Sequence, residues 1–158
     1  MKVICLVGPC YCGKTHFIEH CLNKDGKASV IHLGQYFRQQ KFNGVYVGPE
    51  ILAKTIDYLF HCEHLHDTVI IDNAFKDVYQ AEAVLKLFNK EDVDVYWMND
   101  CRSKVDYTTR GREDDCNISG KLSLWRQNCG YLLKYLQDNN YHLVNVNNTD
   151  GGYVVEDK

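Results

Sequence analysis

The sequence has no apolar run of membrane-spanning length and no excess of positive charge. Its 158 residues carry a formal net charge of −3, with 18 Lys and Arg against 21 Asp and Glu. A spanning helix needs about 20 apolar residues, and a broad nucleic-acid or membrane surface needs clustered positive charge. We therefore expect no transmembrane segment, no nucleic-acid partner and no membrane partner, and any anion-binding charge must be local.

The chain also lacks a linker, an internal repeat and a low-complexity segment. With 45% apolar and 25% charged residues, it has the composition of an ordinary globular protein that is long enough to bury a core. Residues 1–146 are predicted to form a single domain and residues 147–158 a loosely held C-terminal tail. Because the N-terminus enters a strand directly, we expect no signal peptide and a cytoplasmic protein.

The eight cysteines lack the spacing of a zinc site. Cys10 and Cys12 are the one close pair, and no second pair follows at a zinc-ribbon distance, so no structural zinc is expected. The cysteines fall on apolar positions or in a glycine-rich loop, which favours reduced thiols in an intracellular setting. Cys12 precedes a predicted helix N-terminus, where the pKa of a thiol tends to fall, so its oxidation could block the loop. The alternative is that Cys12 is a small tolerated side chain.

The glycine-rich loop Gly8-Pro9-Cys10-Tyr11-Cys12-Gly13-Lys14-Thr15 matches the phosphate-binding pattern G-x-x-x-x-G-K-[ST] at every fixed position. An apolar run precedes it and apolar residues at helical spacing follow it, as the pattern requires. Backbone N–H groups would surround the phosphates, Lys14 would hold the β- and γ-phosphates, and the Thr15 hydroxyl would coordinate Mg²⁺. The predicted nucleotide-binding residues are Gly8, Cys10, Tyr11, Cys12, Gly13, Lys14 and Thr15.

Beyond this loop the chain alternates predicted strands and helices. The expected strands are Val3–Val7, Ala28–Leu33, Thr68–Ile71, Val93–Met98 and His142–Val146. The expected helices begin at Lys14 and span Gln35–Lys41, Pro49–Cys62, Val78–Phe88 and Ile118–Asp138. This order predicts an α/β fold of the P-loop NTPase class, a three-layer sandwich with helices on both faces of a five-stranded parallel sheet.

Asp72 follows the buried run Thr68–Ile71, which places its carboxylate at the C-terminal edge of a central strand. Ligands bind at that edge in open α/β sheets. The position is that of a Walker-B acid, which would hold Mg²⁺ directly or through water. The alternative is that Asp72 caps the N-terminus of the next helix.

The segment from Asp72 to Gln80 resembles the D-G-F-P-R-x-x-x-Q motif of the adenylate kinase-like nucleoside monophosphate kinases. The Asp, a basic residue and the Gln stand at the same spacings, although the Gly, Phe, Pro and Arg identities differ. The resemblance implies that Lys76 contacts the acceptor phosphate and that Gln80 reads the base. Lys76 supplies charge but not the bidentate fork of an Arg.

Two upstream segments extend the resemblance, which covers about residues 1–146. The stretch from His32 to Arg38 is similar to the family's S-T-G-x-L-x-R segment and implies that Arg38 contacts the acceptor phosphate. The stretch from Gly44 to Glu50 is similar to G-x-x-V-x-x-E and implies that backbone near Val47 flanks the base.

The sequence Arg110-Gly111-Arg112-Glu113-Asp114-Asp115 resembles the arginines and paired acids that bound the lid of these kinases. The resemblance implies that Arg110 and Arg112, together with Lys14, stabilise charge on the migrating phosphoryl group. The third lid-side cation of the family aligns with Lys121, and Arg126 on the same predicted helix is the alternative.

Both mobile parts of the family are short in this chain. Only Gly111 separates the two lid arginines, and only five residues separate Arg38 from Gly44. The sequence predicts Mg²⁺- and ATP-dependent phosphoryl transfer to a nucleoside or deoxynucleoside monophosphate, giving the diphosphate. The alternatives are a P-loop kinase for another small acceptor, such as a sugar or a carboxylate, and a nucleotide-binding regulatory protein with little turnover.

Overall fold

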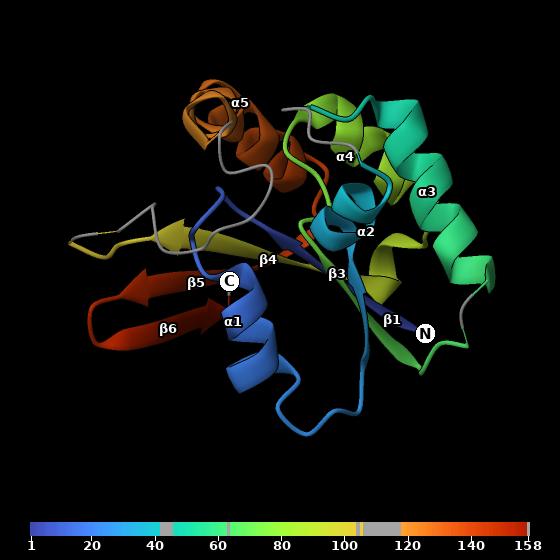
Figure 1. Cartoon of the computed structure of the whole chain (residues 1–158), viewed down its shortest axis with the longest axis horizontal. Helices are drawn as coiled ribbons and strands as arrows, with labels where there is room; N and C mark the ends of the chain where they lie inside the picture. Colours follow the sequence, from blue (N-terminus) through green and yellow to red (C-terminus); the bar gives the residue numbers. More distant parts are fainter. Residues whose placement is uncertain (42–45, 63, 104, 106–117, 158) are drawn as a thin grey trace.

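The computed structural model describes residues 1–41, 46–62, 64–103, 105 and 118–157. Within these residues, six strands form one sheet in the order β2-β3-β1-β4-β5-β6 (Figure 1). The first five strands are parallel to one another, and β6 is antiparallel to β5. The strands are β1 (Lys2–Val7), β2 (Ser29–His32), β3 (Thr68–Asp72), β4 (Val93–Asp100), β5 (His142–Thr149) and β6 (Gly152–Asp157). The predicted α/β class is confirmed, and the parallel part of the sheet has the five expected strands.

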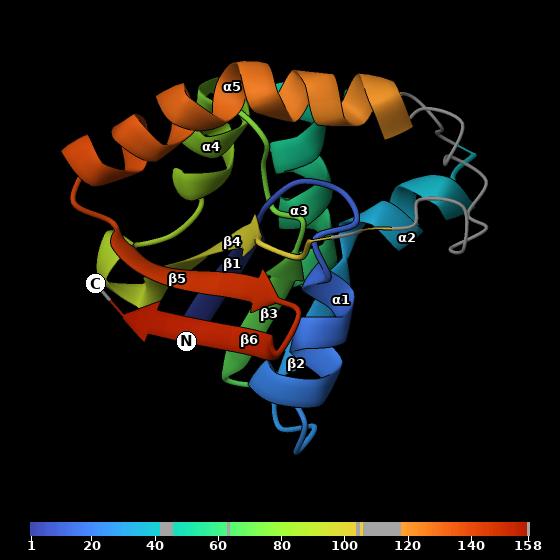
Figure 2. The same ribbon diagram turned by 90° about the vertical axis from the view of Figure 1, so that its left-hand side faces the viewer.

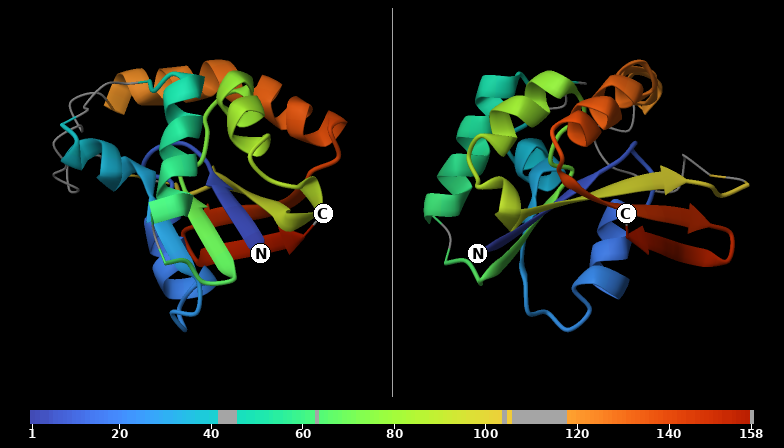
Figure 3. Two further views of the ribbon diagram at one scale, coloured as in Figure 1. Left: turned by 90° about the vertical axis from the view of Figure 1, so that its right-hand side faces the viewer. Right: turned by 180° about the vertical axis from the view of Figure 1, so that it is seen from behind.

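Helices cover both faces of this sheet unequally. The helical elements are α1 (Lys14–Phe17), the π-helical turn η1 (Ile18–Leu22), α2 (Leu33–Gln39), α3 (Pro49–Cys62), α4 (Val78–Leu85), the 3₁₀ turn η2 (Lys90–Asp92) and α5 (Ile118–Asp138). Helices α3, α4 and α5 lie over one face, whereas α1 lies on the other (Figure 3). Within the described ranges, no helix combines the length and the apolar character needed to cross a membrane.

The continuous apolar run of β1 is explained by burial on both sheet faces. Val3, Cys5 and Val7 belong to the core cluster under α3, α4 and α5. Ile4 and Leu6 belong to the smaller cluster that includes residues of α1 and η1. Successive side chains of a strand point to opposite faces, so a strand covered on both sides has apolar residues at consecutive positions.

The C-terminal residues differ from the sequence-based expectation. Residues 147–158 were predicted to form a loose tail, but β5 continues to Thr149 and the chain then returns as β6 along its edge. Figure 2 shows the two strands side by side in opposite directions. Asp150 and Gly151 form the two-residue turn between the paired residues Thr149 and Gly152, and an Asp-Gly pair is a common hairpin signal.

Candidate functional site

The loop between β1 and α1 has a geometry that requires glycine at both ends. A Cβ atom at Gly8 would lie 3.0 Å from the carbonyl oxygen of Met98. Gly13 has φ of +89°, and a Cβ atom there would lie 2.8 Å from Tyr153 Oη and 2.9 Å from Asn148 Nδ2. Positive φ and close approach are the two conditions that only glycine meets without strain. The two fixed glycines of the motif are therefore explained by the backbone of this chain.

The Lys14 ammonium lies inside the loop that precedes it. Its Nζ donates hydrogen bonds to the carbonyl oxygens of Pro9, at 2.7 Å, and Gly8, at 3.1 Å. Lys14 is also the first residue of α1, where backbone N–H groups have no partner inside the helix and favour an anion. A cationic side chain and a helix N-terminus thus meet at one place.

The Thr15 hydroxyl, the Asp72 carboxylate and the His32 ring form a hydrogen-bonded group at the C-terminal edge of the sheet. Thr15 Oγ1 donates to Asp72 Oδ2 at 2.8 Å, and His32 Nδ1 lies 3.1 Å from the same oxygen. Burial raises the pKa of Asp72, but the hydrogen bond from His32, the charge of Lys14 and the hydrogen bond from Thr15 outweigh it, so the pKa lies below its ordinary value. Asp72 is therefore held as a carboxylate.

Asp72 is not a helix cap. The N-cap of the following helix α4 is Asp77, whose side chain accepts a hydrogen bond from the backbone N–H of Gln80. The oxygen atoms of Asp72 and Thr15 are the hard ligands that Mg²⁺ prefers. These two residues fit the metal that the sequence predicts.

One cavity of about 680 Å³ brings together most of the predicted site residues. It is lined by Gly8, Cys10, Tyr11, Gly13, Lys14, Thr15, Arg38, Val47, Asp72, Lys76, Gln80 and Lys121. Trp125 also lines it and packs against Trp97 in the core, with ring centroids 5.3 Å apart and the ring planes tilted by 40°. Lys121 rather than Arg126 is on the cavity wall. Arg110 and Arg112 lie outside the described residues.

Gln80 joins two of the predicted acceptor-binding segments. Its side-chain Nε2 donates to the carbonyl oxygen of Val47 at 2.6 Å, and its Oε1 accepts from the backbone N–H of Lys76 at 2.7 Å. The residue is 3% exposed. Its amide positions the backbone of both segments. These two bonds use one N–H and one lone pair of the amide, which has a second N–H and a second lone pair.

Cys12 fits the reading of a small tolerated side chain and not that of a reactive thiol. Its side chain is buried under the loop, and burial raises its pKa despite the nearby Lys14 charge, which acts in the opposite direction. A thiol with a raised pKa is a poor nucleophile. The predicted fall in pKa is therefore wrong, because desolvation by burial outweighs the charge of Lys14 and its hydrogen bond to the thiol. The side chain of Cys12 packs in the smaller core cluster. Its neighbours Tyr11 and Gly13 line the cavity, and Cys12 does not.

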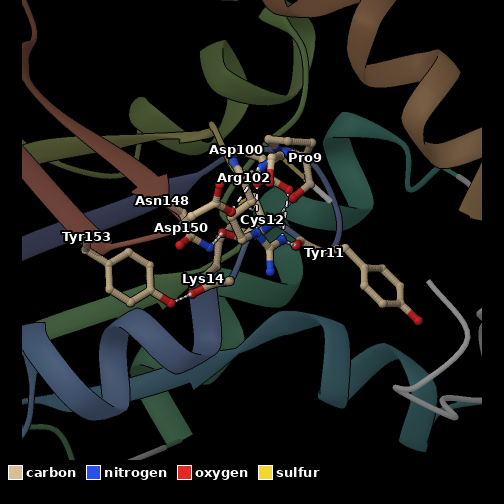
Figure 4. A network of polar contacts seen from close by, with 11 residues as sticks. Pro9, Tyr11, Cys12, Lys14, Asp100, Arg102, Asn148, Asp150 and Tyr153 are labelled. Atoms are coloured by element: carbon tan, nitrogen blue, oxygen red, sulfur yellow. Dashed lines mark hydrogen bonds and ion pairs between the residues drawn. The ribbon is translucent and has the colours of Figure 1, made fainter. Parts of the chain in front are cut away.

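Three residues that the sequence did not single out hold the backbone of this loop (Figure 4). Arg102, after β4, donates to the carbonyl oxygen of Tyr11. Asn148 of β5 donates to that of Cys12, and Tyr153 of β6 donates to that of Gly13. No motif marks these positions, and the only signal was the Asp150-Gly151 turn that pairs β5 with β6.

No protein-family model matches the sequence, and no curated protein matches it at a significant level. Among solved structures, the chain is similar to one described as the structure of the YGR205w protein, with 8% identity, a TM-score of 0.42, and coverage of 99% of this chain and 89% of that one. A likeness of this strength supports no function. The P-loop-like character of the fold rests on the parallel sheet, the strand–loop–helix unit at residues 2–17 and the position of Asp72.

Proposed function

We propose that the protein is a Mg²⁺- and ATP-dependent kinase that transfers the γ-phosphoryl group to a nucleoside or deoxynucleoside monophosphate. The observation that carries the proposal is the shared cavity, because its wall includes a phosphate-binding loop, an acid suited to Mg²⁺ and three further cations. These cations are Arg38, Lys76 and Lys121. A site for two phosphorylated ligands needs more positive charge than a site for one.

In the proposed reaction an oxygen of the acceptor phosphate forms a bond to the γ-phosphorus of ATP. The bond between that phosphorus and the β–γ bridging oxygen breaks, and ADP leaves with the electron pair. An acceptor phosphate is already ionised, so no protein group needs to remove a proton. Catalysis then depends on holding the two ligands in line and on stabilising negative charge.

The charged residues of the cavity and Thr15 have distinct roles in this scheme. Lys14 moves from its loop carbonyls to the β- and γ-phosphates, and Lys121 stabilises the migrating group from the α5 side. Arg38 and Lys76 bind the acceptor phosphate. Thr15 and Asp72 hold Mg²⁺, which when bound supplies charge neutralisation at the triphosphate. Arg110 and Arg112 complete the charge stabilisation in the proposal.

A second candidate is a P-loop kinase for a non-nucleotide acceptor, and the contacts of Gln80 favour it. The residue implied to read the acceptor base already binds Val47 and Lys76 through its amide. A base would have to share this amide or displace it. The acceptor would then be a small molecule recognised mainly by Arg38 and Lys76.

The experiment that tests the proposal measures ADP formation from Mg-ATP with AMP, CMP, UMP, GMP and dTMP added one at a time, against a control without acceptor. Stimulation by one monophosphate, with appearance of the matching diphosphate, would support the nucleotide kinase and name its acceptor. Rates that do not exceed the control without acceptor for any of the five, despite ATP binding, would reject it in favour of another acceptor or of a regulatory nucleotide-binding protein.

Two variants separate binding from turnover. Lys14→Ala should abolish nucleotide binding whether the protein is an enzyme or a regulator. Arg112→Ala should leave ATP binding intact and lower the rate by about a thousandfold, in the range of an arginine that stabilises transferring phosphate. An unchanged rate in Arg112→Ala would show that the assignment of this arginine is wrong.

A further inference from the structure

We propose that Arg102, Asn148 and Tyr153 are positioning residues that hold the phosphate-binding loop in its ligand-ready shape. The inference rests on the proposed function in one respect, namely that the loop binds nucleotide phosphates. No phosphate-binding motif includes the β5–β6 hairpin. The proposal is that contacts from this hairpin and from Arg102 set the affinity of the loop for the nucleotide.

The three residues bind three consecutive carbonyl oxygens of the loop. Arg102 Nη2 donates to Tyr11 O. Asn148 Nδ2 donates to Cys12 O at 3.0 Å, and Tyr153 Oη donates to Gly13 O at 3.1 Å. The donors come from three different strands or strand ends, and they lie between 91 and 140 residues away from their acceptors along the chain.

These contacts determine where the loop N–H groups point. The described peptide bonds are trans, and in a trans peptide the carbonyl of one residue and the N–H of the next point in opposite directions. Holding the carbonyls of Cys12 and Gly13 toward β5 and β6 therefore directs the N–H groups of Gly13 and Lys14 away from the hairpin. Both residues line the cavity, which is where the phosphates bind in the proposed function.

The hairpin pairing explains why two of the donors act together. Asn148 and Tyr153 are directly opposite each other in the β5–β6 register, and residues paired across two strands have side chains on the same face. Asn148 is 7% exposed. The Tyr153 hydroxyl also lies 3.0 Å from His16 Nδ1, and its ring packs edge-on against Phe17, with centroids 5.1 Å apart. The two donors are thus fixed between the loop and α1.

Arg102 is fixed by a neighbouring acid. Its Nε and Nη2 atoms donate to the two carboxylate oxygens of Asp100, each at 2.8 Å. The hydrogen bond from Arg102 lowers the pKa of Asp100 below its ordinary value, so the pair stays ionised at neutral pH. A bidentate Arg–carboxylate pair has a defined geometry, and Nη2 keeps its direction toward Tyr11.

The test compares Tyr153→Phe and Asn148→Ala with the intact protein. Tyr153→Phe removes one hydroxyl and should weaken Mg-ATP binding about fivefold, the effect of one neutral hydrogen bond. Asn148→Ala leaves Cys12 O without its donor in a buried place and should weaken binding about tenfold. Dissociation constants come from calorimetric titration, and the melting temperature of each ligand-free protein is measured alongside.

Asp157→Asn is the matched control on β6. Asp157 lies at the far end of the strand, where it binds His142 rather than the loop. Its substitution should lower the melting temperature without changing the affinity for Mg-ATP. A loss of affinity in Asp157→Asn equal to that in Tyr153→Phe would overturn the proposal, because the hairpin would then act only through general stability.

Hydrogen–deuterium exchange of peptides covering residues 8–17 separates this proposal from the proposed function. In ligand-free Tyr153→Phe and Asn148→Ala these peptides should exchange faster, and in Asp157→Asn they should exchange as in the intact protein. If the intact protein binds no Mg-ATP but these peptides still exchange faster in the two variants than in the intact protein, the proposed function is contradicted and the loop contacts remain supported. Unchanged exchange and unchanged affinity in both variants would overturn the positioning role while the proposed function stands.

Discussion

The Thr15 hydroxyl donates a 2.8 Å hydrogen bond to Asp72 Oδ2, although the two residues are 57 positions apart in the chain. The bond connects the first turn of α1 to the C-terminal end of β3. It forms because β1 and β3 are neighbours in the sheet, with Leu6 paired to Asp72. Parallel neighbours end at the same edge, so the residues that follow β1 meet the last residue of β3.

Replacing Asp72 should remove the Mg²⁺ dependence of nucleotide binding. In Asp72→Asn the carboxylate charge is lost, so the gain in ATP affinity on adding Mg²⁺ should fall at least about tenfold. ATP binding in the presence of EDTA should be equal or tighter, because one negative charge near the phosphates is gone. The measurement is ATP titration with and without Mg²⁺.

Asp67→Asn is the control for this substitution, since Asp67 is exposed and precedes the opposite end of β3. It should behave as the intact protein in both titrations. A normal Mg²⁺ response in Asp72→Asn would show that the metal is held elsewhere.

Gly13→Ala should cost more stability than Gly26→Ala, although both glycines have positive φ. A Cβ atom at Gly26 meets no atom within 4 Å, so that variant should lose only the left-handed conformational cost of about 1 kcal/mol. The Cβ atom at Gly13 also crowds Tyr153 and Asn148 and should add about 1–3 kcal/mol. Urea unfolding measures the difference, and equal losses would contradict it.

The buried cysteines should resist alkylation while the exposed ones react. Burial, with a smaller contribution from Asp94, raises the pKa of Cys5 to about 12, and burial also raises the pKa of Cys12. Cys21, Cys62 and Cys101 are exposed. Iodoacetamide at pH 8 followed by peptide mass spectrometry should therefore label the exposed group first. Early labelling of Cys12 would instead support the reactive thiol that its position before α1 suggested.

The interaction of His142 with two acids should make stability depend on pH. His142 Nδ1 lies 2.8 Å from Asp94 Oδ1, and Nε2 lies 2.6 Å from Asp157 Oδ1. Both nitrogens can donate only in the protonated ring, and the hydrogen bonds to Asp94 and then Asp157 raise the pKa of His142 above its ordinary value. This stabilisation is fully present below the unfolded-state pKa of about 6.5. It is lost as the pH rises through the higher folded-state pKa.

The measurement is the free energy of unfolding at pH 6 and pH 9 for the intact protein and for His142→Gln. The intact protein should be more stable than the variant at pH 6, and the difference should shrink at pH 9. A difference that is the same at both pH values would show that the protonated ring contributes nothing.

The parallel sheet and the strand–loop–helix unit that contains residues 8–15 could be predicted because their sequence signals are local. β1 and β3 are buried on both faces and read as continuous apolar runs. The loop pattern depends on glycines that the backbone itself requires. Helices α3 and α5 were predicted at the residues where they begin and end, since proline opens the first and a long apolar stripe marks the second.

β6 could not be predicted in the same way, because its residues are mostly exposed and do not alternate clearly. Its place depends on pairing with β5 and on the contacts of Tyr153 and His142, which join distant parts of the chain. The pKa of Cys12 is raised where the sequence predicted a fall, and the cause is similar, because the burial that raises it depends on the assembled core. A helix N-terminus can be recognised from sequence, but the depth of the neighbouring side chain cannot.

The contacts that hold the loop of residues 8–15 join distant parts of the chain, since Asn148 and Tyr153 follow their acceptors by 136 and 140 residues. A ribosome adds roughly 5–20 residues per second, so the loop is made on the order of ten seconds before the residues that orient it. The earlier strands β1 to β4 can pair in that interval. The ordered shape of this loop is then the last property that the chain acquires during synthesis, and truncation before residue 153 should yield a folded sheet with a poorly ordered loop.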